Sequence, residues 1–447
     1  MLRIRHWLLV GLLACSLGLP RSADAADKKE IERTYLRRAE ENIKEYRMDR
    51  ATVVFRTDSG DSAVPQRVEI QQLNHDFLFG CIAFPLVWAE DLYRPERFKR
   101  RFTELFNFAI LPFYWGAYEQ KPGRPRWQQT VSVARWAREN DITLKGHPLV
   151  WTHPAGVPGW IADFPKASRN DLLKARVMSS VAGFKNSINM WDVVNEPTHT
   201  RAWTNWDADD YVSEPVDRMA DYVEKCHRWA HTANPEAALI LNDFEIMTDR
   251  DRRDRFAALV RELTSRDVPL SGLGLQAHEP RYEWFSPPEV WKTLDRMSDL
   301  GYPLHVTEFI PTSGGHEITG EWKEGTWTEQ NQADYAAMMY KLWFGHPDVQ
   351  SINWWGLSDR DIWLEGGGLV DEEYEPKPVY RRLHDLIHNR WTTRVTVQDV
   401  PDEGRVSFRG FHGDYRVTVH VGDGEVREFT KHLGPEGPHR WTLAIED

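Results

Sequence analysis

The feature that most restricts how this chain can fold is an alternation of short apolar runs with longer amphipathic stretches between residues 77 and 387. The apolar runs have β-like composition and lie at residues 77–83, 106–111, 143–151, 188–195, 238–242, 272–276, 303–308 and 351–356. The stretches between them place apolar residues at helical spacing, as at 127–140, 171–184, 216–233, 249–264 and 328–344. Such an alternation is typical of βα units around a parallel sheet. Eight units predict an α/β fold, a (β/α)8 TIM barrel over residues 76–388.

Short β-like segments flank the predicted barrel on both sides. Residues 28–46 are rich in Glu, Arg and Lys and predict an exposed helix, while residues 51–72 alternate apolar and polar side chains around a turn at 58–61. Alternating segments at 394–397, 405–408 and 415–419 predict a small antiparallel sheet. We therefore expect a helix with a small β unit over 27–75 and a small C-terminal β unit over 389–447. For the latter, capping the barrel is favoured over binding sugar.

The first 26 residues have the pattern of an export signal. Arg3 and Arg5 precede an apolar run at 7–13, and small residues at 23–25 supply a cleavage site. This predicts a signal peptide over 1–26 and a secreted or periplasmic protein. Residues 12–15 also resemble a lipoprotein box, so the alternative is a lipid anchor at Cys15 that holds the protein at the outer membrane. Elsewhere no stretch approaches the roughly 18 apolar residues of a membrane span.

The net charge of the chain narrows the range of partners. The whole chain has a formal net charge of −12; residues 1–26 carry three arginines and one aspartate, so without them the charge is −14. This net negative charge disfavours nucleic acid as a partner, because nucleic acid is itself a polyanion.

Beyond Cys15, only Cys81 and Cys226 remain, and we expect two buried free thiols rather than a disulfide. The seventeen histidines show no His-Glu-x-x-His spacing, so we expect no metal and no cofactor. The oligomeric state is left open.

Glutamates close two of the predicted strands, where a TIM barrel carries its active site. The fourth run ends at Asn195-Glu196 and the seventh at Thr307-Glu308. Two carboxyl groups about 5 to 5.5 Å apart across the barrel mouth suit a retaining glycoside hydrolase, in which one protonates the glycosidic oxygen and the other attacks the anomeric carbon. Their surroundings would have to raise the pKa of one and keep the other ionised.

Together these motifs resemble those of the glycoside hydrolase family 10 endo-β-1,4-xylanases over residues 76–388. The matching segments are Gly146-His147-Pro148-Leu149-Val150-Trp151, Trp191-Asp192-Val193-Val194-Asn195-Glu196, Gln276-Ala277-His278, Val306-Thr307-Glu308, Trp354-Trp355-Gly356, Gly367-Gly368-Leu369-Val370-Asp371 and Lys377-Pro378-Val379-Tyr380. The resemblance implies Glu196 as acid/base, Glu308 as nucleophile and double displacement through a covalent glycosyl-enzyme. It also implies a β-1,4-linked polysaccharide or oligosaccharide substrate, with xylan as the default.

The resemblance further implies a set of substrate-binding residues, His147, Trp151, Asn195, Gln276, His278, Trp355 and Trp363. Asn195 would bond the sugar 2-hydroxyl, its alternative being a strand-end turn former. His278 would hold Glu308, its alternative being a satisfied core histidine. His147 would contact the same sugar, or else orient neighbouring loops. Trp355 and Trp363 would cage the sugar ring with their indole faces, rather than serve as core tryptophans.

The chain departs from the family pattern in three places. After strand two the family has Glu-Asn and then Lys-Trp, which bind the sugar two places from the cut. Here an aromatic segment, residues 111–117 with Phe113, Tyr114 and Trp115, predicts a wall that changes or closes that subsite. The Trp-His after strand three is Trp151-Thr152.

The third departure concerns the nucleophile motif. The family's Thr-Glu-x-Asp is Thr307-Glu308-Phe309-Ile310, which removes the aspartate that orients the histidine beside the nucleophile. We therefore predict that His278 is held less firmly than in a typical member, with Glu279 as the candidate substitute partner.

Two functional alternatives stand beside a xylanase. One is the same chemistry on a non-xylan or decorated glycan, which the altered segment 111–117 suggests. The other is a non-catalytic barrel that binds glycans or proteins. The presence of Glu196, Glu308 and Asn195 disfavours it, because a binding protein has no need of them.

Overall fold

The computed structural model describes residues 25–89, 91–199, 214–360 and 362–445. Residues 1–24 of the predicted signal peptide, including Cys15, lie outside the described part of the chain. Within that part, no helix combines the length and the apolar character needed to cross a membrane.

Eight parallel strands close into a barrel in chain order, with the last pairing with the first through Ile352 and Phe79. The strands are β3 (Leu78–Ile82), β4 (Phe108–Pro112), β5 (Thr143–His147), β6 (Met190–Asn195), β7 (Ala238–Asp243), β8 (Gly272–Leu275), β9 (Leu304–Phe309) and β10 (Val349–Trp354). Each overlaps one of the eight predicted runs, so the α/β fold with a TIM barrel is confirmed. The runs read as nearly continuous apolar stretches because most strand residues are buried on both faces of the sheet.

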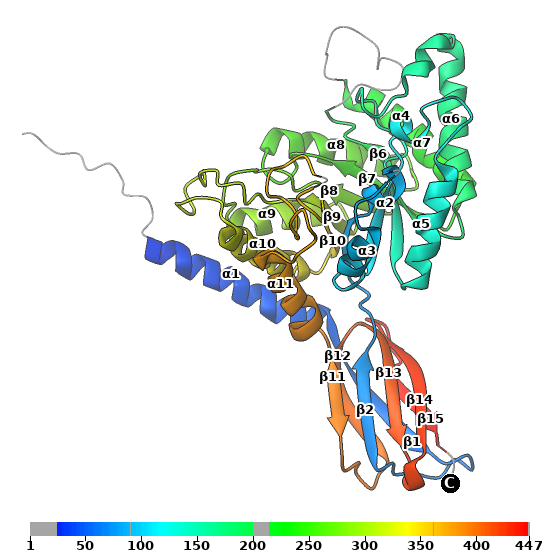
Figure 1. Ribbon diagram of the computed structural model, residues 1–447, viewed down its shortest axis with the longest axis vertical. Coiled ribbons are helices and arrows are strands. Elements are labelled where there is room, and N and C mark those ends of the chain that lie inside the picture. Colours follow the sequence, from blue (N-terminus) through cyan, green and yellow to red (C-terminus); the bar gives the residue numbers. More distant parts are fainter. Residues whose placement is uncertain (1–24, 90, 200–213, 361, 446–447) are drawn as a thin grey trace, which may run out of the picture.

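Helices cover the outside of the barrel (Figure 1). The helices that follow the strands are α2 (Phe84–Trp88), α3 (Pro95–Thr103), α4 (Trp115–Tyr118), α5 (Trp127–Glu139), α6 (Lys166–Gly183), α7 (Val216–Ala233), α8 (Arg250–Ser265), α9 (Pro287–Ser298), α10 (Glu329–Phe344) and α11 (Pro378–Asp385). Short turns of 3-10 and π-helix lie at Gly159–Asp163 and Leu386–Arg390. The predicted stretches at 249–264 and 328–344 begin on N-cap residues, because Asp249 and Thr328 accept the backbone N–H groups of Arg252 and Asn331.

A separate two-sheet β-sandwich contains strands from both flanks of the barrel (Figure 1). One sheet has the order β12 (Arg405–Phe411), β1 (Met48–Arg56) and β15 (Arg440–Ala444), and the other β11 (Arg394–Val397), β2 (Arg67–Gln72), β13 (Gly413–His420) and β14 (Val426–Leu433). The prediction of two separate β units is therefore corrected. Residues 51–72 offer too few strands to be stable alone, and their apolar faces, such as Phe55 and Ile70, share one core with Tyr415 and Trp441.

The sandwich adjoins the N-terminal ends of the barrel strands. Asn107, just before β4, donates from its side chain to the carbonyls of His75 and Phe77 in the connection from β2 to β3. Buried Arg47, at the start of the sandwich, donates to three carbonyls at and beyond the end of α10. The sandwich thus lies at the end of the barrel opposite to the C-terminal strand ends, an arrangement that suits capping.

The N-terminal helix is less exposed than its composition suggests. Helix α1 (Ala25–Tyr46) packs along α9 and α10, with Ala39 and Ile43 buried and the Arg38 guanidinium 4.3 Å above the ring of Trp291. The prediction of an exposed helix therefore holds for one face only. Between the charged residues, an apolar stripe at helical spacing docks on the barrel.

The two cysteines of the described residues are both buried and unpaired, as predicted for Cys81 and Cys226.

Candidate active site

Most of the predicted site residues gather at the C-terminal ends of the barrel strands, as the fold requires. Asn195 ends β6 and Glu308 is the penultimate residue of β9, while Glu196, Gln276 and Trp355 follow directly after their strands. The carboxyl groups of the two glutamates belong to one hydrogen-bonded network of side chains.

Glu308 is a nearly buried carboxylate with a donor on each oxygen. Its Oε1 accepts from Nδ2 of Asn242 at 2.8 Å, and its Oε2 lies 2.8 Å from Nε2 of His278. Only 4% of the residue is exposed. Two donors fix the direction of the carboxylate, which suits attack on a carbon held above it.

Glu196 lies in a setting that favours its protonated form. Burial and the negative charge of Glu308 raise its pKa to about 7, and Asp243 adds to this effect. Hydrogen bonds partly oppose the rise: Nε1 of Trp151 donates to Oε2 at 2.9 Å, and Nε2 of Gln276 donates to Oε1 at 3.2 Å. The two glutamates therefore have the different environments that an acid and a nucleophile need.

Asn242, at the end of β7, connects the two glutamates and was missed in the sequence analysis. Its Nδ2 donates both to Oδ1 of Asn195 at 2.7 Å and to Glu308, and its Oδ1 accepts from Oγ1 of Thr307. Asn195 in turn donates from Nδ2 to Glu196 at 3.3 Å. The sequence did contain a signal for Asn242, since the apolar run at 238–242 also ends on a polar residue.

His147 has both ring nitrogens occupied by protein groups. Nδ1 lies 2.7 Å from Oδ2 of Asp192, and Nε2 lies 3.1 Å from the hydroxyl of Tyr114 and 3.9 Å from Oε1 of Glu308. The residue has no exposed surface. This geometry favours an orienting role over the direct sugar contact that the resemblance implied.

The ring of His278 is held from one side. Among the described residues, its Nδ1 has no hydrogen-bond partner, which agrees with the loss of the family's aspartate. Glu279 does not replace that aspartate, because its carboxylate accepts from the backbone N–H and Nε of Arg281.

The predicted tryptophans differ in exposure. Trp355 is 6% exposed and lies edge-on to His147 and His278, whereas Trp363 is 51% exposed and lies edge-on to His278 with a ring separation of 5.4 Å. Trp151 stacks on His153, with ring centroids 4.3 Å apart, and points its N–H at Glu196. Trp151 therefore contacts Glu196 directly, while Trp355 and Trp363 lie against His278, the residue that bonds Glu308.

Only one of the three aromatic residues predicted to form a wall reaches this cluster. Phe113 is fully buried against Trp191, and Trp115 is buried against Trp160. Tyr114 lies between them in sequence and points to His147 and Trp151. The predicted wall of three residues is therefore wrong, because successive side chains of this segment point in different directions.

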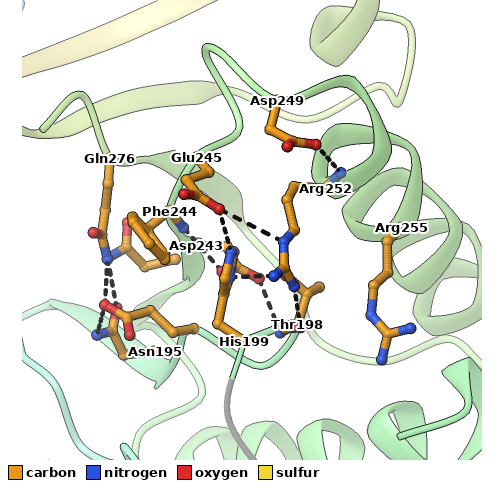
Figure 2. Close-up of polar contacts among 12 residues, drawn as sticks. Asn195, Thr198, His199, Asp243, Phe244, Glu245, Asp249, Arg252, Arg255 and Gln276 are labelled. Carbon is orange, nitrogen blue, oxygen red and sulfur yellow. Dashed lines mark hydrogen bonds and ion pairs between the residues drawn. The ribbon is translucent and has the colours of Figure 1, made fainter. Parts of the chain in front are cut away.

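A second polar cluster anchors the loop that carries Glu196 (Figure 2). The carboxylate of Asp243 accepts the backbone N–H of Thr198 at 3.1 Å and lies 2.8 Å from Nδ1 of His199. Nε2 of His199 lies 3.1 Å from Glu245. Burial alone would lower the pKa of His199, but its hydrogen bond to Asp243 and that residue's charge outweigh burial and raise it. A cationic imidazole between two carboxylates thus ties the loop after β6 to the loop after β7.

Glu196 itself has a left-handed backbone conformation, with φ at 54°. For a residue with a side chain this conformation is strained and persists only where the surroundings hold it. Its N–H donates to the carbonyl of Asn242 at 2.8 Å, and its carbonyl accepts from the N–H of His199 at 3.1 Å. The backbone bonds and the His199 cluster together fix the position of the Glu196 carboxyl group.

Among the described residues, no group of three or more His, Cys, Asp or Glu side chains is arranged to hold a metal ion.

Comparison with known proteins places this geometry in context. Residues 102–386 match the model of glycosyl hydrolase family 10. Endo-1,4-beta-xylanase B of Thermotoga neapolitana is 27% identical over 353 residues, which are 75% of this chain and 95% of that protein. Endo-1,4-beta-xylanase 3 of Arabidopsis thaliana is 25% identical over 81% of this chain, which spans 44% of the plant protein. The crystal structure of native xylanase 10B from Thermotoga maritima superposes with a TM-score of 0.57 at 25% identity, covering 70% of this chain and 96% of that one.

Proposed function

The chain belongs to glycosyl hydrolase family 10 and is a glycoside hydrolase, and we propose that it cleaves β-1,4-linked polysaccharide or oligosaccharide with retention, xylan being the default substrate. The observation that carries the proposal is the unequal pair of glutamates. Glu308 is held by two donors, and the charge of Glu308 helps to raise the pKa of Glu196 to about 7. The xylanase activity named for the relatives supports the choice of xylan.

In the proposed first step, Glu308 attacks the anomeric carbon while Glu196 gives its proton to the glycosidic oxygen. The bond to the leaving sugar breaks, and an ester joins the remaining sugar to Glu308. Asn195, bonded to both Asn242 and Glu196, has its amide beside the reacting centre, where a bond to the sugar 2-hydroxyl would strengthen in the transition state.

The second step uses the same pair with Glu196 as a base. Once Glu308 is esterified its negative charge is gone, and with it one of the two largest causes of the raised pKa of Glu196. The pKa of Glu196 should then fall, so that its carboxylate takes a proton from water as the water attacks the anomeric carbon. The ester breaks and Glu308 is regenerated with overall retention.

A pH profile tests this assignment. Because Glu196 must be protonated in the free enzyme and its pKa is about 7, kcat/KM is expected to be high below that pH and to fall as pH rises through it. Steady-state rates on an unactivated oligosaccharide between pH 4 and 9 provide the measurement. A profile that stays flat from pH 6 to 9 would rule Glu196 out as the acid.

The His199 cluster gives a second prediction. Replacing His199 by phenylalanine removes a cation between Asp243 and Glu245, so their uncompensated charges should raise the pKa of Glu196 further. The alkaline limb of kcat/KM should move to higher pH, and kcat should fall about tenfold as the loop loosens. The matched control is His231→Phe, which changes an exposed histidine near the end of α7. A lower kcat with an unmoved alkaline limb would show that His199 acts on the loop but not on the charge of Glu196.

Substrate identity is tested by incubating the purified protein with a panel of β-linked polysaccharides and analysing the products by mass and anomeric configuration. Release of xylose or xylo-oligosaccharides of β configuration supports xylan, and release from another glycan only would favour the alternative specificity suggested by the altered segment 111–117. Turnover with inversion, or of no glycan in the panel, would contradict the proposal.

A further inference from the structure

Tyr114 holds an unusual place beside the proposed nucleophile. The nitrogen of His147 that bonds its hydroxyl at 3.1 Å is the same one that lies 3.9 Å from Oε1 of Glu308. The sugar that Glu308 attacks must lie within about 3 to 3.5 Å of that carboxylate at its anomeric carbon. The hydroxyl of Tyr114 therefore lies at the edge of the space that this sugar occupies.

Of His147 and Tyr114, only Tyr114 has exposed surface with which it can contact a substrate. His147 is fully buried, whereas Tyr114 is only partly buried. Its ring makes edge-on contacts with Phe84, at 5.8 Å between centroids, and with Trp151, at 5.6 Å. Trp88 adds a tilted contact at 5.7 Å. The ring is thus fixed by aromatic neighbours from helix α2 and from the loop after β5, and its hydroxyl has a defined position.

The buried charge of Asp192 determines which group donates in the hydrogen bonds from Asp192 through His147 to Tyr114. Burial alone would raise the pKa of Asp192, but Lys145, with Nζ 2.7 Å away, and His147 hold it below its ordinary value. The ionised carboxylate can only accept, so Nδ1 of His147 donates to it, and in the neutral imidazole Nε2 is then the acceptor. The hydroxyl of Tyr114 then donates to Nε2, and its oxygen keeps lone pairs that face away from His147.

We propose that Tyr114 is a specificity-determining residue that accepts a hydrogen bond from one hydroxyl of the sugar attacked by Glu308, in place of the buried His147. The inference rests on the proposed function, because it is the attack by Glu308 that places the sugar. Burial and the charges of Glu308 and Glu196 raise the pKa of Tyr114 well above its ordinary value, so the phenol stays protonated throughout the working pH range. As a neutral group it bonds a hydroxyl without competing with the catalytic carboxylates for protons.

The test pairs one enzyme change with single changes in the substrate. Wild type and Tyr114→Phe are assayed with p-nitrophenyl β-xyloside and with its 2-deoxy, 3-deoxy and 4-deoxy analogues. The phenylalanine variant is expected to lose about tenfold in kcat/KM on the parent substrate. For one deoxy position only, the decrease in kcat/KM that wild type shows relative to the parent substrate should be absent in Tyr114→Phe. The missing sugar hydroxyl and the missing Tyr114 hydroxyl are then the two partners of one hydrogen bond.

The control makes the same chemical change elsewhere. Tyr302→Phe removes a hydroxyl that bonds Thr264 on the outside of the barrel, and it should leave all four kcat/KM values unchanged. If every deoxy penalty is the same in Tyr114→Phe as in wild type, Tyr114 does not bond the sugar and the inference is overturned while the proposed function stands. If wild type hydrolyses none of the four glycosides and also releases no product from the panel of β-linked polysaccharides, the proposed function fails and the inference fails with it.

Discussion

Replacing Glu308 by glutamine is expected to lower kcat/KM on the best natural substrate by about 10⁴-fold or more, because an amide cannot form the covalent glycosyl-enzyme. The change is close to isosteric, and the amide oxygen can still accept from Nδ2 of Asn242. The site should therefore keep its shape while losing its nucleophile. Steady-state kinetics, with substrate binding measured separately by calorimetry, should show the loss in kcat and not in affinity.

The matched control for this variant is Glu279→Gln. Glu279 lies one residue beyond His278 but pairs with Arg281, and it should retain full turnover. A 2-deoxy-2-fluoro glycosyl fluoride should label wild type on the peptide that contains Glu308, as read by mass spectrometry. Labelling of another residue, or full turnover by Glu308→Gln, would remove Glu308 from the role of nucleophile.

Replacing Glu196 by alanine is expected to have an effect that depends on the leaving group. On an unactivated glycan the rate should fall by about 10² to 10⁴, since proton donation to the departing oxygen is lost. On a dinitrophenyl glycoside, whose leaving group needs no proton, formation of the ester should remain fast and its hydrolysis should become limiting. Azide should then restore turnover and give a β-glycosyl azide, because a small anion can attack without a general base.

Measurements for this variant are pre-steady-state bursts and product analysis by nuclear magnetic resonance. Equal losses on both substrate types, with no response to azide, would argue against an acid/base role.

The melting temperature of Glu196→Gln, measured as a function of pH, tests the raised pKa of Glu196 independently of activity. Since the folded-state pKa of Glu196 is raised from 4.5 to about 7, the contribution of this group to wild-type stability falls by about 3 kcal/mol as pH rises from about 4.5 to 7. The glutamine variant should melt above wild type at pH 8 but not at pH 4.

Local patterns predicted the parts of the fold that local sequence determines. Each barrel strand was found from its own apolar run, and both glutamates from the polar residues that close those runs. Contacts across the barrel could not be found in this way. Asn242 and Glu308 are 66 residues apart, and their contact depends on the register of β7 to β9, which no single segment encodes.

Local patterns also could not show that only Tyr114 of the predicted aromatic wall points into the barrel mouth, or that the two flanking β units form one sandwich. Three successive aromatic residues suggest one wall, yet only the backbone path after β4 decides which side chain points into the mouth. Likewise, the alternating segments at 51–72 and 394–445 look independent because their pairing partners lie on the other side of the barrel in sequence. The loss of a partner for Nδ1 of His278 could be foreseen, since it follows from one missing aspartate.

The sandwich also sets an order of events during synthesis. Strands β1 and β2 leave the ribosome first, but β11 follows β2 only after about 320 residues of barrel. At roughly 5 to 20 residues per second, the first two strands wait from about 15 s to about a minute for their partners. During that time their edges are open to mispairing with other chains. The barrel is thus an insertion that must fold between the two halves of its own neighbour, and cells that make the protein must keep those early strands apart until the last ones arrive.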